Sequence, residues 1–379
     1  MFIFWFALFA LMLLYGQVLL FRRFIFHQLE YSRAFKQTVC FRGDEIELVE
    51  RLDNKKRLPI PWLRVESQLS SQLAFRKGEN FDVSSGEVYQ NHRSLFSLGG
   101  YTRLTRTHTI RPMRRGVYEL NSVTMTGGDL FGHTHVCMQI PLNDRLVVYP
   151  KPADVPFDEL PSCSWQGDHS VRRFIVPDPF VVAGARAYSA GDSMKQINWK
   201  ATARRGELQV HKYDFTADRK LLICLNGEDG EQMWKSISNE KLIEHGIEWA
   251  AGVAERAVAQ SMEVGFCTNM PMDPSRQSVS VEPGRGQEHL VLIYETLARL
   301  ILERTESFKE LLETESLKAY SNCDVLVISA YWNDELELSA NRLRAKGNSV
   351  SVWQLNELTD DEPIGNRETT TGQVEGRGA

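Results

Sequence analysis

Residues 221–226, LLICLN, form a continuous apolar run. A strand of this composition is buried on both faces, as in a parallel sheet covered by helices. Residues 324–330, DVLVISA, repeat the pattern, and residues 239–260 between them have apolar side chains at helical spacing. Strands that alternate with helices predict an α/β unit with a mostly parallel sheet over residues 217–356. Within it we expect further strands at 263–268 and 349–355, an edge hairpin at 278–282, and helices at 288–303, 306–319 and 333–346.

Residues 24–150 show a different pattern, because apolar and polar residues alternate there with period two. Ile46 and Leu48, for example, alternate with Glu45 and Glu47. Turn sequences that contain glycine recur between the alternating runs, at a spacing of about ten residues that is typical of short antiparallel strands. The pattern predicts an antiparallel β-sandwich whose sheets each have one apolar and one solvated face.

Residues 2–21, FIFWFALFALMLLYGQVLLF, contain no charged side chain. As a helix they would be about 30 Å long, which matches the hydrocarbon thickness of a bilayer. No Lys or Arg precedes the run and no small-x-small cleavage site follows it. We therefore interpret residues 1–23 as a retained transmembrane anchor rather than a signal peptide. Arg22 and Arg23 follow the span, and this positive charge predicts that the bulk of the chain is cytoplasmic.

The overall composition is that of a soluble globular protein behind this anchor. The 379 residues include 44 Lys and Arg against 49 Asp and Glu, a net charge of −5. This balance argues against a protein that binds nucleic acid through bulk positive charge. The six cysteines show no C-x-x-C pair and no dense spacing, which argues against a disulfide framework. Residues 357–379 are rich in acidic and poor in apolar residues, so we expect them to be disordered.

The connecting segment, residues 151–216, contains a long charged motif. Its residues 184–212, GARAYSAGDSMKQINWKATARRGELQVHK, hold six cations against two acids, a local charge of +4 in an acidic protein. The motif residues are Arg186, Tyr188, Gly191, Asp192, Ile197, Asn198, Trp199, Lys200, Ala203 and Arg204, and Arg205 follows them. In this register the segment resembles the signature R-x-Y-x-x-G-D-x-x-R-x-I-N-W-K-x-(T/S)-A-R of the family called domain of unknown function 58. Lys195 stands at the central arginine of that signature, which preserves the charge but loses the bidentate fork.

The resemblance extends to PIPWLRV at 59–65, RRGVYEL at 114–120 and GGDLFG at 127–132. It implies a β-sandwich followed by a von Willebrand factor A-like α/β domain, tethered to the membrane. Family members are inferred to act with MoxR-type AAA+ ATPases in assembling or activating protein complexes, and no enzymatic activity is attached to them. We therefore expect a membrane-anchored, cytoplasm-facing scaffold or adaptor, with a MoxR-type ATPase or its client as partner.

Two interpretations of residues 184–212 stay open at this point. In the first, the segment is a packed clasp that joins the two domains, with Asp192 paired to Arg186 or Arg204. In the second, it is an exposed basic surface that receives an acidic partner or a phosphate. Its mixed composition, which includes a tryptophan, favours the clasp, because large aromatic side chains are more often buried than exposed.

The resemblance also implies a place to look for a metal. A-type domains hold a divalent cation at D-x-S-x-S after the first buried strand, with a Thr and an Asp from later loops, because hard cations prefer oxygen ligands. In this chain Asn226, Glu228 and Gly230 stand at those positions, and Thr268 and Asp334 are the later candidates. Loss of the Asp and of both Ser predicts that no metal binds, and we interpret the stretch as a solvated turn.

Other motifs give little support to an enzyme. His133 and His135, near Asp129, lack a third spaced ligand for zinc. The chain contains no Walker A, H-E-x-x-H or G-x-S-x-G sequence. We therefore expect no catalytic residue and no cofactor. The alternative is a membrane-bound hydrolase with an unrecognised site, which titratable groups clustered in one cleft would favour.

Overall fold

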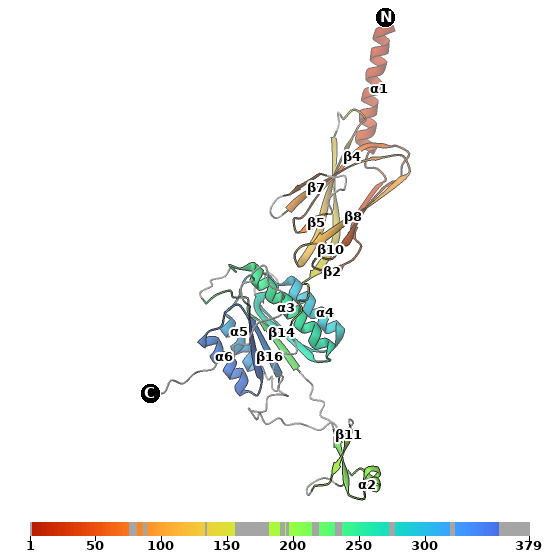
Figure 1. The fold of residues 1–379 in the computed structure, drawn as a ribbon. Coiled ribbons are helices and arrows are strands. Elements are labelled where there is room, and N and C mark those ends of the chain that lie inside the picture. Colours follow the sequence, from red (N-terminus) through yellow and green to blue (C-terminus); the bar gives the residue numbers. More distant parts are fainter. Residues whose placement is uncertain are drawn as a thin grey trace.

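The computed structural model describes residues 2–75, 82–85, 89–132, 135–155, 182–189, 194, 197–213, 220–231, 237–272, 277–318 and 323–355. These residues form an apolar N-terminal helix, a unit of two β-sheets, an α/β unit and a small hairpin with one helix (Figure 1). The N-terminal helix and the hairpin lie at opposite ends of the molecule in this view. The expected acidic tail at 357–379 lies outside the described residues.

Helix α1 (Phe2–Phe24) contains the predicted apolar run. It is long and apolar enough to cross a membrane, and no residue of its most apolar window is buried in the protein. Phe21 and Ile25, at its C-terminal end, are buried against the first sheet unit. Lys56 Nζ donates a 2.8 Å hydrogen bond to Ile25 O, which satisfies a carbonyl at the end of the helix. The helix is thus fastened to the sheet unit at one end only.

The β-sandwich unit consists of a four-stranded sheet, in the order β1-β3-β8-β5, and a six-stranded sheet, in the order β2-β10-β9-β4-β7-β6. Its strands are β1 (Leu29–Phe35), β2 (Val39–Phe41), β3 (Ile46–Asn54), β4 (Ile60–Ser70), β5 (Leu73–Phe75), β6 (Asp82–Ser85), β7 (Tyr89–Leu98), β8 (Thr102–Pro112), β9 (Gly116–Gly128) and β10 (His135–Tyr149). Paired strands are antiparallel except β2 and β10, which are parallel. Apolar side chains of both sheets share the buried clusters, so the predicted alternation places one face of each sheet in the core.

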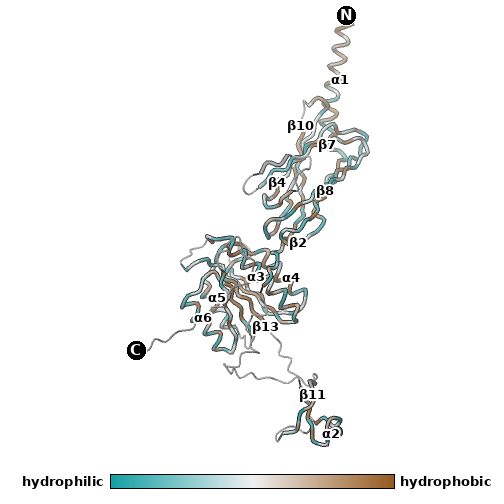
Figure 2. The backbone as a smooth tube through the Cα atoms, viewed as in Figure 1, coloured by the Kyte–Doolittle hydropathy of each residue, from teal (hydrophilic) through white to brown (hydrophobic). Residues whose placement is uncertain are grey.

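The α/β unit contains a five-stranded sheet in the order β15-β14-β13-β16-β17. Four strands are parallel, namely β13 (Lys220–Leu225), β14 (Glu263–Pro271), β16 (Cys323–Ser329) and β17 (Ser349–Gln354), and β15 (Ser278–Gly284) is an antiparallel edge. The helices are α3 (Glu240–Ala259), α4 (Gly286–Arg299), α5 (Phe308–Leu317) and α6 (Asp334–Ala345). Hydrophobic residues concentrate in the central strands (Figure 2).

The apolar run at 221–226 has the environment that its composition predicts. Leu221, Ile223 and Leu225 pack with residues of α3 and α4 on one face of the sheet. Leu222 and Cys224 pack with residues of α5 and α6 on the other. Two helices therefore cover each face, and the central strand is buried on both sides.

One helix ends earlier than expected. Helix α4 stops at Arg299 rather than at residue 303, because Leu300 leaves the helical conformation. The carbonyls of Leu297 and Leu300 accept hydrogen bonds from the guanidinium of Arg115, at 2.9 and 3.0 Å. An arginine of the β-sandwich unit thus satisfies groups that a helix end leaves without partners.

Candidate functional site

The charged motif folds into a small unit that we call the basic arm (residues 184–189 and 197–212). Strands β11 (Val182–Ala187) and β12 (Gln209–Tyr213) pair antiparallel, and helix α2 (Trp199–Arg205) lies between them in sequence. The arm lies apart from both the β-sandwich and the five-stranded sheet (Figure 1).

Some motif residues build the arm. Asn198 is the N-cap of α2, where its Oδ1 accepts a 3.0 Å hydrogen bond from Ala201 N. Its own backbone N donates to Gln209 O at 2.8 Å, so the cap is also tied to β12. Thr202 Oγ1 accepts a 3.0 Å hydrogen bond from Gln209 N, which adds a second tie. The Asn and Thr of the motif are therefore needed for the local fold.

Other motif residues are exposed. Trp199 is 66% exposed, Tyr188 is 38% exposed, and no residue of α2 is buried. The cations Arg186, Lys200, Arg204 and Arg205 are exposed as well. The clasp interpretation is wrong for α2, because a helix that joined two domains would bury its tryptophan. Gly191, Asp192 and Lys195 lie outside the described residues, so the expected pairing of Asp192 lies there too.

The expected metal position lies at the carboxyl ends of three parallel strands. Asn226 follows β13 and is fully buried; its Nδ2 donates to Ser329 Oγ, at the end of β16, at 2.9 Å. Its Oδ1 accepts a 2.9 Å hydrogen bond from Glu228 N, which shapes the turn. Asn269, on β14, accepts a 2.8 Å hydrogen bond from Gly227 N at its Oδ1. Side-chain amides and a hydroxyl therefore hold the three strand ends together.

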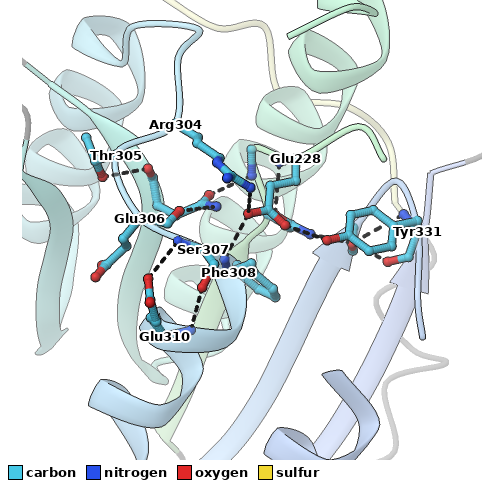
Figure 3. A network of polar contacts seen from close by, with 12 residues as sticks. Glu228, Arg304, Thr305, Glu306, Ser307, Phe308, Glu310 and Tyr331 are labelled. Carbon is cyan, nitrogen blue, oxygen red and sulfur yellow. Dashed lines mark hydrogen bonds and ion pairs between the residues drawn. The ribbon is translucent and has the colours of Figure 1, made fainter. Parts of the chain in front are cut away.

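Glu228 is the centre of a buried polar network (Figure 3). It is only 3% exposed. Its carboxylate accepts hydrogen bonds from Arg304 Nη1 at 2.9 Å, from Phe308 N at 3.1 Å and from the hydroxyl of Tyr331. Phe308 is the first residue of α5, so the carboxylate also lies at the positive end of that helix. Burial, with the hydrogen bond to Glu228, raises the pKa of Tyr331.

This environment corrects the interpretation of the stretch as a solvated turn. Glu228 is buried because a segment far along the chain, from Arg304 to Phe308, covers it. Thr268 is buried and its Oγ1 accepts from Met270 N, whereas Asp334 is exposed in the first turn of α6. Gly230 offers no side chain. A guanidinium thus neutralises the one carboxylate at this edge.

Among the described residues, no group of three or more His, Cys, Asp or Glu side chains could hold a metal ion. His133 lies outside these residues, so the pair with His135 is not described. The expectation that no metal binds stays a prediction.

A second buried polar group lies between the sheets of the β-sandwich and was missed by sequence reasoning. It includes Arg33, Glu50, His92 and His108, each at most 3% exposed. Glu50 Oε1 accepts a 2.7 Å hydrogen bond from the hydroxyl of Tyr31. His108 Nε2 lies 3.6 Å from Glu50 Oε2, and the rings of His92 and His108 are 5.4 Å apart.

The electrostatics of this group follow from burial and from its own charges. Burial alone would raise the pKa of Glu50, but the hydrogen bond with His108 and the charge of Arg33 outweigh it and lower the pKa. Burial lowers the pKa of His92 to about 3, with the charge of Arg33 adding to the effect. The position of Glu50 in the alternation of β3, in phase with Ile46 and Leu48, was the sequence feature that could have revealed it.

The two units meet at a third set of contacts, the junction. Arg42 Nη2 lies 2.7 Å from Glu248 Oε1 on α3, and the ring of Phe41 meets that of Tyr294 on α4 edge-on at 5.5 Å. Gly252 on α3 leaves room for the carbonyl of Ala153, which an added Cβ would approach to 2.1 Å. An open hollow of about 420 Å³ lies here, lined by Arg114, Arg115, Gly116, Val117, Glu244, Met272, Ala298, Arg299, Leu300 and Leu302.

Comparisons with known proteins agree with the motif. A family model described as "Protein of unknown function DUF58" matches residues 184–362, which include the basic arm and the α/β unit. A Bacillus subtilis (strain 168) protein described as "Uncharacterized protein YeaD" is 21% identical over 248 residues. That alignment covers 65% of this chain and 60% of the relative, so the chain spans about 60% of the length of the curated relative it matches.

Solved structures share only a part of the chain. A non-cellulosomal cohesin from Archaeoglobus fulgidus is 11% identical, with 31% of this chain and 91% of the cohesin covered and a TM-score of 0.23. A ScaB type I cohesin from Pseudobacteroides cellulosolvens is 13% identical, with 32% and 94% covered and a TM-score of 0.22. Scores this low carry no argument about fold or function. The resemblance read from the motif is confirmed by the match of this chain, over residues 184–362, to the DUF58 family model.

Proposed function

We propose that this protein is a membrane-anchored scaffold or adaptor whose basic arm docks an acidic protein surface, that of a MoxR-type AAA+ ATPase or of its client. The observation that carries the proposal is the exposure of Trp199, at 66%, on a helix that also presents Lys200, Arg204 and Arg205. Tryptophan and arginine dominate the binding energy of many interfaces, whereas an exposed tryptophan contributes little to stability.

The charge of the arm supports an acidic partner. A local charge of +4 in a chain of net charge −5 would speed and orient the encounter more than it would add affinity. Binding should weaken as salt is raised, because exposed charges are screened over about 8 Å at physiological ionic strength.

The rest of the fold supports an anchored platform. We propose that α1 spans the membrane and that Arg22 and Arg23 keep the bulk of the chain in the cytoplasm. We also propose that the α/β unit is von Willebrand factor A-like, with Asn226, Glu228 and Gly230 as a degenerate metal position. A reporter fused after Ala379 tests the orientation, since a cytoplasmic readout is expected and efficient translocation would contradict it.

Docking is tested by co-purification from gently crosslinked native membranes. Arg205→Glu and Trp199→Ala should abolish capture of the partner and leave the melting temperature unchanged. Lys241→Glu, at an exposed position of α3, is the matched charge reversal and should retain capture. If no ATPase or client co-purifies with the unmodified chain, or if all three variants behave alike, the docking proposal fails.

The hydrolase alternative gains no specific observation. The hollow at the junction is lined by Arg114, Arg115 and Glu244 but by no serine, cysteine or histidine. The histidines, Glu50 and Arg33 of the β-sandwich are buried between its sheets rather than in that hollow. We therefore do not propose it.

A further inference from the structure

The loop between β9 and β10 lies beside the apolar helix rather than with the other loops of the β-sandwich. Gln17 Nε2, within α1, donates a 3.4 Å hydrogen bond to Asp129 Oδ2. Ile25, just after α1, lies so close to Gly127 that an added Cβ would be 2.8 Å from Ile25 Cδ1. In Figure 1 the connection that follows β9 rises alongside α1. The contacts therefore place residues 129–132 next to the last turns of the helix.

The position of Gln17 sets the depth of this loop. Gln17 precedes Arg22 by five residues, which is about 7.5 Å along a helix at 1.5 Å per residue. If the apolar run at 2–21 fills the hydrocarbon layer, Gln17 lies about 6 Å inside its boundary. A loop that contacts Gln17 has then passed the level of Arg22.

The side chains of the loop suit that depth. Leu130 is 60% exposed and Phe131 is 63% exposed, next to a helix whose own apolar side chains are exposed. Asp129, by contrast, is fully buried. Its carboxylate accepts from Gln17, and its carbonyl accepts a 3.0 Å hydrogen bond from Trp62 Nε1. The polar atoms of the loop thus have partners, while its large apolar side chains have none among the described residues.

We propose that residues 129–132 form a membrane-inserted loop, with Leu130 and Phe131 in the lipid beside α1. The occupant of this surface is the bilayer, because the exposed apolar side chains continue the apolar surface of α1 without a break. Isolated exposed apolar residues need no explanation, but a pair continuous with a span does. The inference rests on the proposed insertion of α1.

Other residues at the same end of the β-sandwich suit the membrane surface. Pairing of Leu29 with Asn54, and of Asn54 with Thr102, brings the turns after β3 and β7 to the end where α1 enters. These turns expose Arg57 and Tyr101, the latter to 72%. Basic and aromatic side chains are enriched at membrane–water interfaces. Two contacts with the bilayer, the helix and the loop, would fix the tilt of the β-sandwich and hold the basic arm away from the membrane.

The test uses the full chain in liposomes of zwitterionic and anionic phospholipid. Cys137 and Cys163 are replaced by serine, and Cys40, Cys224, Cys267 and Cys323 are buried. A nitroxide is attached in turn to Phe131→Cys, to Leu11→Cys in the middle of α1, and to Met113→Cys. Met113 follows β8 at the opposite end of the β-sandwich and is 54% exposed, so it is the matched control.

Power-saturation electron paramagnetic resonance then compares collisions of each label with oxygen, which enriches in lipid, and with a water-soluble nickel chelate. We expect the label at 131 to resemble that at 11, with oxygen favoured, and the label at 113 to favour nickel. If the label at 131 resembles that at 113 while the label at 11 favours oxygen, the loop proposal fails and the anchor stands. If the label at 11 also favours nickel, the anchor fails, and the inserted loop with it.

Discussion

Arg115 Nη1, in the turn before β9, donates a 2.6 Å hydrogen bond to Glu244 Oε1 on α3. The side chain of Arg115 is 3% exposed and that of Glu244 is 20% exposed. The same guanidinium donates to two carbonyls at the end of α4. One arginine of the β-sandwich therefore binds two helices of the α/β unit, and the two units are coupled through it.

Arg115→Ala should destabilise the protein by about 3–5 kcal/mol, because it leaves Glu244 without its buried partner. Arg114→Ala is the matched control, since Arg114 lies in an exposed pair with Glu240 and should contribute at most about 1 kcal/mol. Denaturant unfolding in detergent, followed by tryptophan fluorescence, measures both. Equal effects of the two substitutions would contradict a special role for Arg115.

Glu228→Ala should cost about 3–5 kcal/mol as well, because Arg304, Phe308 N and Tyr331 lose a buried charged acceptor. Glu228→Gln keeps the size and one acceptor oxygen and should cost less. Glu335→Ala removes an exposed pair with Lys309 and should change stability by less than about 1 kcal/mol. The same denaturant experiment applies, and a Glu228→Ala variant as stable as Glu335→Ala would show that the network is not formed.

Buried His92 predicts that stability falls with pH. Its pKa is about 3 in the folded protein and about 6.5 when unfolded. The unfolded chain therefore binds more protons in this range, and stability rises with pH between about 3 and 6.5. From pH 7 to pH 5 this one group should remove about 2 kcal/mol. The groups that act on His92 are Arg33 on β1, Glu50 on β3, and Arg106 and His108 on β8.

His92→Gln should remove that part of the pH dependence, whatever it does to stability at pH 7. The slope, rather than the absolute free energy of unfolding, is thus the quantity to compare. His135→Gln, at an exposed position, is the control and should leave the slope unchanged. If the His92→Gln protein keeps the full slope between pH 7 and pH 5, another group is responsible.

Millimolar Mg²⁺ or Mn²⁺ should not raise the melting temperature beyond the effect of a sodium salt at equal ionic strength. The reason is that the one carboxylate at the strand ends is already neutralised by Arg304. A ligand that binds only the folded state must stabilise it by linkage. A rise that saturates with metal concentration would therefore overturn the prediction.

The fold was predictable from sequence wherever the pattern is local. The run at 221–226 is buried on both faces, and the alternation in β3 places Ile46 and Leu48 in the core, because periodicity records which face of a strand meets water. The length and composition of α1 likewise follow from residues 2–24 alone. The motif was visible in the same way, since its residues lie within one short segment.

Contacts between distant segments could not be predicted in this way. The alternation marks Glu50 as inward, but only strand pairing and sheet packing bring it to His108, Arg33 and Tyr31. Residues 226–230 have the composition of a solvated turn, yet Glu228 is buried because Arg304 and the start of α5 return to it.

The sequence by itself determined the elements, their order and the family motif, because each depends on residues that are neighbours in the chain. Tertiary structure alone decided that Trp199 is exposed, that Glu228 binds an arginine, and that residues 129–132 lie against α1. The physical reason is that the burial of a polar or aromatic side chain depends on which distant segment covers it. No local periodicity records that partner.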